Sequence, residues 1–267
     1  MKPRIGISMN YRTTSEGGER AYLDAKYFDA IAELGAVPIP IVPTDNTILL
    51  GAILRNLHGV LFTGGLDLDP ALYNQPLHPD TELVHPRRQR FDFMLYEQTC
   101  KRRLPIFGIC LGIQTINVAH GGSLHQCLTD LDQTIDHEPE EPDKTCTHTI
   151  RIRRKSKLHQ WLHTDQIVVP THHRQALAQI GKGLLAVAIA EDGIVEAIEI
   201  PQLPFGLAVQ WHPESALDAP VNRIILQRFL DAANQQANAP ENASKNDKNL
   251  TPPEMPRAKL ISRVPDP

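Results

Sequence analysis

The sequence predicts an α/β fold, in which a mostly parallel central sheet is flanked by helices and antiparallel strands are added in the second half. In the first half, short apolar runs alternate with segments of helical periodicity, and the connections are short. This pattern is typical of a parallel sheet covered on both faces. In the second half, alternating apolar and polar residues around turn-forming pairs indicate antiparallel strands. The chain of 267 residues is long enough for one domain with a sizeable core.

The first half contains buried apolar runs that we interpret as strands, with amphipathic segments between them. The predicted strands cover residues 4–8, 37–42, 58–62 and 104–109. The predicted helices cover residues 19–34, 90–101 and 113–119. Gly35 provides a C-terminal stop for the first helix. Prolines in the second strand favour a position near an edge or a bulge.

The second half is predicted to form strands and a closing helix. The strands cover residues 147–153, 184–190, 194–200 and 205–210, and the helix covers 221–233. Asp192-Gly193 lies between two of these strands and suits a tight type I′ hairpin turn. We therefore expect one domain over residues 1–233.

Two segments have compositions typical of poor order. Residues 130–143 are rich in acids and prolines, which predicts a solvated loop. Residues 234–267 contain no aromatic residue and repeat Asn, Lys and Pro, so they bury too little apolar surface to offset the entropy of ordering. The sequence therefore predicts a disordered tail.

Composition excludes several classes of partner. The chain is 41% hydrophobic and 22% charged, with a formal net charge of -4, so neither nucleic acid nor an anionic membrane is expected to bind it. No segment approaches the roughly 18 apolar residues that a spanning helix needs, and the N-terminal residues lack a secretory pattern. The four cysteines form no C-x-x-C pair, which favours the reducing cytoplasm.

One cysteine stands in a pattern that indicates a nucleophile. Cys110 follows a predicted strand and precedes a predicted helix, with Gly108 and Gly112 two residues on either side. Small flanking residues allow the sharp strand-to-helix corner of a nucleophile elbow, here with sulfur in place of the serine oxygen. The helix N-terminus favours the thiolate form. The alternative is a buried cysteine in a glycine-rich turn.

A candidate base and its orienting acid occur together downstream. His212 and Glu214 are separated by Pro213, which disfavours helical geometry at the histidine. In an extended segment, residues two apart project to the same side, so the carboxylate can hold one ring nitrogen while the other faces the nucleophile. Alone, this triplet would be a surface His-Pro turn; the elbow cysteine in the same chain favours the catalytic interpretation.

Chain order distinguishes between the families that use such an elbow. The order here is nucleophile, histidine, acid, whereas an α/β-hydrolase has nucleophile, acid, histidine. Relatives of the intracellular-protease type usually place a histidine directly after the cysteine, and this chain has Leu111 there. Neither assignment fits well.

The motifs together resemble the class I glutamine amidotransferase superfamily, and within it the stand-alone γ-glutamyl hydrolases of the peptidase C26 branch, whose best-known member acts on γ-glutamyl-γ-aminobutyrate. The resemblance covers roughly residues 4–229. The stretches that carry it are 64–70, 105–122, 192–197 and 209–214. It implies a flavodoxin-like fold and a catalytic set of Cys110, His212 and Glu214.

The resemblance also implies further site residues. The backbone N–H groups of Gly65 and Leu111 would form the oxyanion hole, although the same Gly-Gly loop is compatible with a simple turn. Gln114, His173 and Gln175 would contact substrate, with a plain packing role as the alternative for Gln114.

Departures from the branch leave the substrate open. Leu111 replaces the arginine usual after the nucleophile and is more typical of synthetase-linked glutaminases. The usual Arg-Asp-x-x-Glu stretch appears as 88–92, and the usual Asn-Ser-x-His-x-Gln stretch as 170–175. Other histidines, including His120, His125, His148 and His172, show no H-E-x-x-H spacing, so we expect no catalytic metal and no cofactor.

Three functions are considered. The first is hydrolysis of a small-molecule γ-glutamyl amide through a thioester on Cys110, which the lack of any fused synthetase domain favours. The second is a glutaminase subunit that passes ammonia to a separate synthase, which Leu111 supports. The third is a catalytically idle regulatory protein on the same scaffold, which the intact catalytic set disfavours. The sequence leaves the oligomeric state open, a homodimer included.

Overall fold

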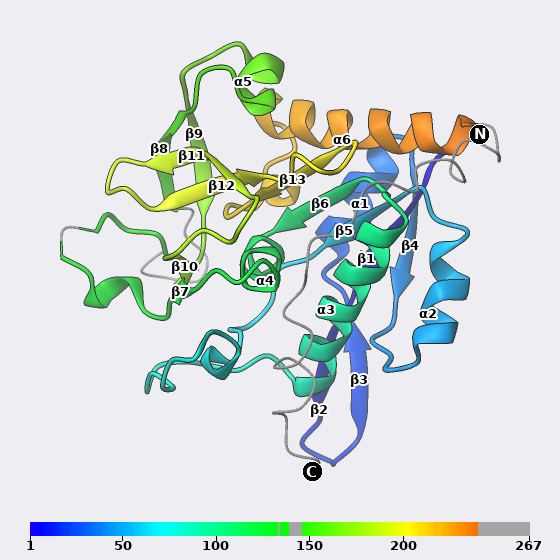
Figure 1. The fold of residues 1–267 in the computed structure, drawn as a ribbon, viewed down its shortest axis with the longest axis horizontal. Helices are drawn as coiled ribbons and strands as arrows, with labels where there is room; N and C mark the ends of the chain where they lie inside the picture. The colour runs from blue at the N-terminus through cyan, green and yellow to red at the C-terminus, as the bar shows by residue number, and fades with distance from the viewer. Residues whose placement is uncertain (133, 139–145, 240–267) are drawn as a thin grey trace.

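A mixed β-sheet forms the centre of the computed structural model, which describes residues 1–132, 134–138 and 146–239 (Figure 1). Five strands run parallel to their neighbours in the order β4 (Val37–Ile41), β1 (Arg4–Ser8), β5 (Gly59–Phe62), β6 (Ile106–Ile109) and β13 (Gly206–Val209). The sheet continues antiparallel through β12 (Val195–Glu199), β11 (Leu185–Ala190), β8 (Cys146–Ile152) and β9 (Gln166–Thr171). This is the predicted α/β architecture.

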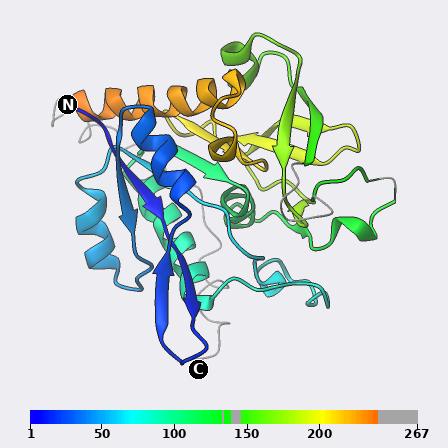
Figure 2. The ribbon, with the colours of Figure 1, turned by 180° about the vertical axis from the view of Figure 1, so that it is seen from behind.

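Short elements extend this sheet. The two-residue strand β10 (Ala176–Leu177) pairs with β12 and with β7 (Leu124–His125). A separate hairpin is formed by β2 (Asn10–Thr13) and β3 (Glu19–Tyr22), which projects from one end of the molecule (Figures 1 and 2). Single 3-10 turns are η1 (Pro70–Tyr73), η2 (Leu128–Asp130) and η3 (Pro213–Ser215).

Helices cover both faces of the parallel strands and divide the core into two apolar layers. One layer includes side chains of α1 (Ala25–Glu33) and α6 (Pro220–Asn238). The other includes side chains of α2 (Thr47–Leu54), α3 (Pro86–Lys101) and α4 (Leu111–Ala119). The short α5 (Lys157–Leu162) packs beside α6. This arrangement explains why the parallel strands are apolar on both sides.

The predicted helix over residues 19–34 is wrong in its first part. Glu19–Tyr22 is strand β3, because it pairs with Asn10–Thr13 in a hairpin that the local periodicity does not show. The helix begins only at Ala25, after Asp24, whose carboxylate accepts the backbone N–H of Lys26 at 3.0 Å. An N-cap of this kind satisfies a donor that the helix itself leaves free.

The other three predicted helices extend beyond their predicted bounds, and α4 begins two residues early, at Leu111. Helix α3 begins at Pro86, where proline suits the first position and His85 caps the N–H of Arg87. Helix α6 continues to Asn238, so residues 234–238 are helical rather than part of a tail. Its last turn is closed by Asn238 Nδ2, which donates to the carbonyl of Asn234 at 2.8 Å. Residues 240–267 of the predicted tail lie outside the described residues.

The hairpin between β11 and β12 forms, but its turn is not type I′. Gly193 has φ +91°, whereas Asp192 is not among the residues with positive φ, and a type I′ turn requires both. Gly193 N donates to Ala190 O, and Ala190 N donates to Ile194 O. The loop is therefore a three-residue turn that closes with glycine in the left-handed region.

The segment predicted as a solvated loop is only partly described, and residues 133 and 139–145 lie outside the description. Within it, His137 is buried and its backbone carbonyl accepts the N–H of His173.

Helix α2 was not predicted, because it is apolar on nearly all sides and shows no amphipathic period. Asn46 nevertheless caps it by accepting the N–H groups of Ile48 and Leu49.

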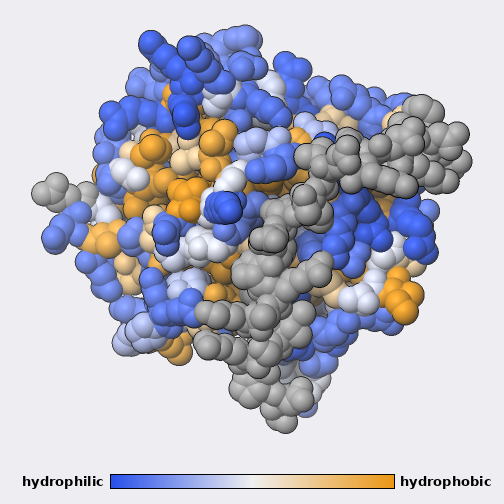
Figure 3. Space-filling model, in the orientation of Figure 1, coloured by the Kyte–Doolittle hydropathy of each residue, from blue (hydrophilic) through white to orange (hydrophobic). Residues whose placement is uncertain are grey.

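The face seen in Figure 3 is largely hydrophilic, with apolar side chains gathered over the antiparallel half of the sheet. Exposed large apolar residues on these strands are Val168, Leu185 and Ile189. Within the described ranges, none of the helices has the length and apolar character needed to cross a membrane.

The corner between β6 and α4 gives a test of packing. A methyl group at Gly112 would lie 2.7 Å from the carbonyl oxygen of Phe62 in β5, which cannot move aside as a flexible side chain could. We expect Gly112→Ala to lower the free energy of unfolding by about 1–3 kcal/mol. Gly51→Ala in α2 is the matched control, because its added methyl group meets only the end of the Arg102 side chain.

The control substitution replaces a poor helix former and should be neutral or stabilising by up to about 1 kcal/mol. Denaturant unfolding of both variants measures the difference. Equal stability of Gly112→Ala and the unmodified protein would show that the corner is not closely packed.

Candidate active site

The candidate site lies at the carboxyl ends of the parallel strands, where loops from different strands meet. Asn10 follows β1, Gly64 follows β5, Cys110 follows β6 and His212 follows β13. These residues share a pocket of about 470 Å³, a size typical of small-molecule sites. The described residues that line it are Asn10, Tyr22, Leu23, Asp24, Tyr27, Gly64, Gly65, Cys110, His172 and His212.

Cys110 occupies a strained corner between β6 and α4. Its φ of 51° and ψ of -104° are rarely adopted by a residue with a side chain. The flanking glycines make the corner sterically feasible, since a methyl group at Gly108 would lie 2.9 Å from the Ala208 Cβ and one at Gly112 would meet β5. This is the geometry of a nucleophile elbow, which exposes the side chain above the sheet.

His212 and Glu214 form a close pair, with 2.7 Å between His212 Nδ1 and Glu214 Oε1. The segment is not extended throughout, which differs from the prediction. Residues Pro213–Ser215 form the 3-10 turn η3, in which Ser215 N donates to His212 O, and this turn brings the carboxylate under the ring. The Glu214 side chain is only 3% exposed, whereas the His212 side chain is 21% exposed, so the carboxylate is shielded from water and the ring reaches the pocket.

The His212 ring also meets the nucleophile. The two side chains are close enough for the Cys110 sulfur to raise the pKa of His212. A methyl group on Gly64 would lie 3.1 Å from His212 Cε1 and 3.5 Å from Cys110 Cβ, so the three residues converge on one point. The imidazole therefore lies between the cysteine and the carboxylate, which is the order of groups that nucleophilic catalysis requires.

The electrostatics favour a charged imidazole beside the sulfur. Burial alone disfavours the imidazolium, but the neighbouring Glu214 carboxylate and the Cys110 sulfur outweigh it and hold the pKa of His212 well above its ordinary value. A protonated His212 places a positive charge next to the Cys110 sulfur.

The loop after β5 is fixed by two side chains. Gly64 N donates to the Tyr27 hydroxyl at 3.0 Å, and Gly64 O accepts from Asn10 Nδ2 at 3.3 Å. Because the peptide bond is planar and trans, holding the Gly64 carbonyl also sets the direction of the Gly65 N–H. Gly65 lies against Leu111, and within the described part of the chain neither N–H donates a hydrogen bond.

A fully buried arginine supports this loop from below. Arg88 Nη1 donates to Asn10 Oδ1 at 2.8 Å, and Arg88 Nε donates to Asp92 Oδ2 at 2.6 Å. Arg88 Nη2 reaches the hydroxyl groups of Ser8 and Thr63 at 3.1 Å each. Residues 88–92, which depart from the usual family stretch, thus hold the end of β1 and the start of β2 against the loop after β5. The i,i+4 spacing of Arg88 and Asp92 is visible in the sequence, but no local signal identifies Asn10 or Tyr27.

The three residues expected to contact substrate lie elsewhere. Gln114, His173 and Gln175 are 3%, 5% and 1% exposed, and none of the three lines the pocket. Gln114 Nε2 donates to the Gln175 carbonyl at 3.1 Å, so these two residues contact one another. His172, one residue earlier than expected, lines the pocket instead.

The other cysteines differ from Cys110 in their surroundings. Cys100 is buried in α3, and burial raises the pKa of its thiol to about 12. Cys127 and Cys146 are half-buried and lie outside the pocket. All four cysteines are free thiols in the structure.

The peptidase C26 family pattern matches residues 3–214 of this sequence. The chain belongs to this family, within the class I glutamine amidotransferase superfamily. It is accordingly an enzyme of the hydrolase and amidotransferase class.

Individual relatives support this membership. A Mycobacterium tuberculosis protein assigned as a glutamine amidotransferase is 39% identical over 220 residues, covering 81% of this chain and 69% of the relative. The γ-glutamyl-γ-aminobutyrate hydrolase of Escherichia coli K12 is 30% identical over 239 residues, covering 86% and 93%. A solved Thermoplasma acidophilum structure, assigned as one of the subunits of GMP synthase, shares the fold with a TM-score of 0.61 at 15% identity, covering 89% and 96%.

The charged imidazole should make Cys110 the most reactive thiol at neutral pH. We expect iodoacetamide at pH 7 to label the peptide containing Cys110 faster than those containing the other cysteines, as measured by mass spectrometry. His212→Ala should slow this labelling by about tenfold or more, because an unassisted thiol is only a few per cent thiolate at pH 7.

His159→Ala is the matched control, since this histidine pairs with Asp165 at the surface away from the pocket. It should leave the rate at Cys110 unchanged. An equal rate in His212→Ala and the unmodified protein would remove the imidazole from any role in activating the sulfur.

Proposed function

We propose that this protein hydrolyses the amide bond of small-molecule γ-glutamyl amines, with Cys110 as nucleophile, His212 as general acid and base, and Glu214 as the residue that orients His212. The observation that carries the proposal is the strained placement of Cys110 in a pocket that it shares with a His212 ring held by Glu214.

The proposed reaction has two stages. The Cys110 thiolate attacks the γ-carbonyl carbon, and the resulting oxyanion collapses as His212 protonates the departing amine. This leaves a γ-glutamyl thioester on Cys110. Water, deprotonated by His212, then attacks the thioester, and glutamate and the free thiolate are released. Throughout both stages, the Glu214 carboxylate keeps its hydrogen bond with His212 Nδ1.

We infer that the N–H groups of Gly65 and Leu111 stabilise the oxyanion. Three observations support this role: both N–H groups lack a partner within the described residues, Gly65 packs against Leu111, and Asn10 fixes the intervening peptide of the loop. Leu111 N also lies at the start of α4, where the helix dipole favours negative charge.

The pocket chemistry supports a substrate with an amino group. Among the described lining residues, Asp24 carries a carboxylate and none is lysine or arginine. The α-ammonium of a glutamyl group or a cationic amine half would suit this lining. The similarity to γ-glutamyl-γ-aminobutyrate hydrolases makes γ-glutamyl-γ-aminobutyrate the first compound to assay.

A glutaminase that delivers ammonia to a separate synthase is the second candidate. Leu111 favours it, because synthetase-linked glutaminases have a similar residue after the nucleophile. The two candidates share the thioester chemistry and differ in the leaving group and in the need for a partner.

Purified protein should release glutamate from γ-glutamyl-γ-aminobutyrate, or from γ-glutamyl amides with a terminal amine, faster than from glutamine. Coupled glutamate detection measures this, and Cys110→Ala should abolish it because no second thiol lines the described part of the pocket. Cys127→Ala is the control with full activity. Turnover of glutamine alone, rising strongly with a co-purified protein, would support the glutaminase instead, and undiminished activity of Cys110→Ala would end both proposals.

Loss of the Asn10 side chain should release the Gly64 carbonyl and allow the Gly65 N–H to turn away. We expect Asn10→Ala to lower kcat about 10- to 100-fold with a small change in KM, because an oxyanion donor acts mainly in the transition state. Asn46→Ala removes an amide at the start of α2 and serves as control for general stability effects. A change confined to KM would make Asn10 a substrate-binding residue instead.

A further inference from the structure

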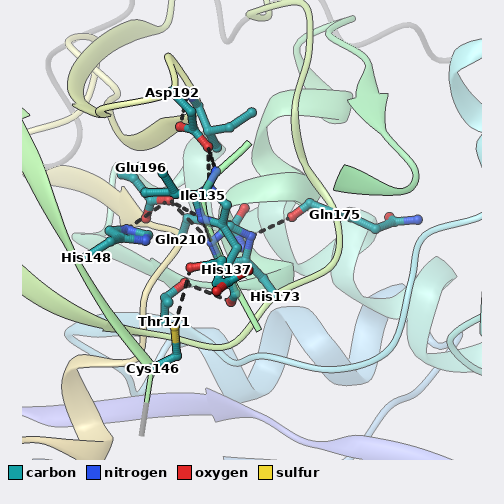
Figure 4. A network of polar contacts seen from close by, with 12 residues as sticks. Ile135, His137, Cys146, His148, Thr171, His173, Gln175, Asp192, Glu196 and Gln210 are labelled. Carbon is teal, nitrogen blue, oxygen red and sulfur yellow. Dashed lines mark hydrogen bonds and ion pairs between the residues drawn. The ribbon is translucent and has the colours of Figure 1, made fainter. Parts of the chain in front are cut away.

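A second group of polar side chains is buried among the antiparallel strands, outside the pocket (Figure 4). His148 comes from β8, Glu196 from β12, and His173 follows β9. His137 comes from the segment 134–138, and Asp192 lies in the turn before β12. The side chains of these five residues are between 0% and 4% exposed.

We propose that this cluster is a structural binding site for a divalent transition metal of the zinc type, with His137, His148 and Glu196 as ligands and His173 as the fourth side chain at the ion. His137, His148 and Glu196 each offer a ligand atom, and these atoms lie within 4.8 Å of one another. Two histidines and a glutamate are a ligand set that zinc uses in proteins.

The distances between the donor atoms are close to those between the ligand atoms of a tetrahedral metal ion. His137 Nδ1 lies 3.2 Å from His173 Nε2 and 3.5 Å from Glu196 Oε1, and His173 Nε2 lies 3.3 Å from the same oxygen. Zinc bonds of about 2.0–2.1 Å in a tetrahedron place neighbouring ligand atoms about 3.3 Å apart. These three atoms therefore form a triangle of the size of one tetrahedral face.

In His137 and His173, the ring nitrogen that does not face the other ring makes a polar contact of the kind found in metal-binding histidines. His137 Nε2 pairs with Asp192 Oδ2 at 2.8 Å, and His173 Nδ1 pairs with the carbonyl oxygen of Gln175 at 3.0 Å. If each ring is neutral and donates there, His137 Nδ1 and His173 Nε2 turn unprotonated lone pairs toward each other. A cation between them removes the repulsion, and such outer contacts are typical of metal-binding histidines.

Four atoms in the cluster have no hydrogen-bond partner within the described residues. They are both ring nitrogens of His148 and both carboxylate oxygens of Glu196. An unpartnered polar atom in a dry interior destabilises a protein, and a buried carboxylate requires an opposite charge. His148 Nε2 lies 3.4 Å from Glu196 Oε1, so both can face one ion.

The origin of the ligands explains why no metal motif is visible in the sequence. They come from three segments separated by about ten to fifty residues, and no two have the spacing of a helical metal motif. An ion here would join the segment 134–138 to β8 and β12. It would also stabilise the backbone next to the candidate active site. Gln210, two residues before His212, donates its backbone N–H to the carbonyl oxygen of Glu196.

The test uses full-length Cys110→Ala protein, so that the sulfur of the candidate active site cannot bind metal and catalytic failure cannot affect the result. After removal of bound metal with EDTA, we expect one equivalent of Co²⁺ to give the visible absorption of tetrahedral cobalt, and Zn²⁺ to displace it. The melting temperature should rise on binding.

Two substitutions locate the ion. His148→Gln should weaken Co²⁺ and Zn²⁺ binding at least 10- to 100-fold, and Asp192→Asn, which keeps the side-chain shape, should weaken it by about 10- to 100-fold through His137. The matched control is His78→Gln, in the more exposed group His78, Cys127 and Asp130, which should bind metal normally. Asp192→Asn decides the question if His148→Gln does not fold.

Failure of the folded, metal-free protein to bind either ion would overturn the proposal and leave a protonated histidine as the partner of Glu196. Binding that persists in both cluster variants but is lost in His78→Gln would move the site to the surface and equally overturn it.

Discussion

The sharp backbone corner at Cys110 is the constraint on which the rest of the site depends. A residue with φ 51° and ψ -104° costs about 1–3 kcal/mol relative to relaxed backbone and persists only where its surroundings fix it. Here β6 is paired on both sides, with β5 and β13, and Cys110 N donates to Val209 O at 2.9 Å. The two glycines allow β5 and α4 to approach closely enough to hold the corner.

The buried Arg88 serves the loops in a similar way. Its guanidinium is fully buried, and its contacts run to one carboxylate, one amide and two hydroxyl groups from separate parts of the chain. Burying such a charge is unfavourable unless its donors are used, so the site depends on each of those partners. The arrangement ties the junction of β1 and β2 to the loop after β5, and hence positions the peptide that precedes Gly65.

Local patterns account for what the sequence could predict. Residues close together in the sequence predict the parallel strands of the first half, the elbow at Cys110 and the pairing of His212 with Glu214. The structure contains all three features. Residues 19–22 have a helical period but form a strand, because their partner is chosen by tertiary pairing. Asn10, Tyr27 and the cluster around Glu196 depend on contacts between distant segments, which no local spacing records.

The order of the sheet also bears on how copies of this protein can meet. Its outermost strands are β4 and β9, and both contain proline, at positions 38 and 40 in one and 170 in the other. Val37 N points inward to the Pro3 carbonyl, so the alternating prolines turn their donor-free nitrogens outward. The edge formed by β4 is therefore a poor template for another strand, which disfavours edge-to-edge addition at this side of the sheet.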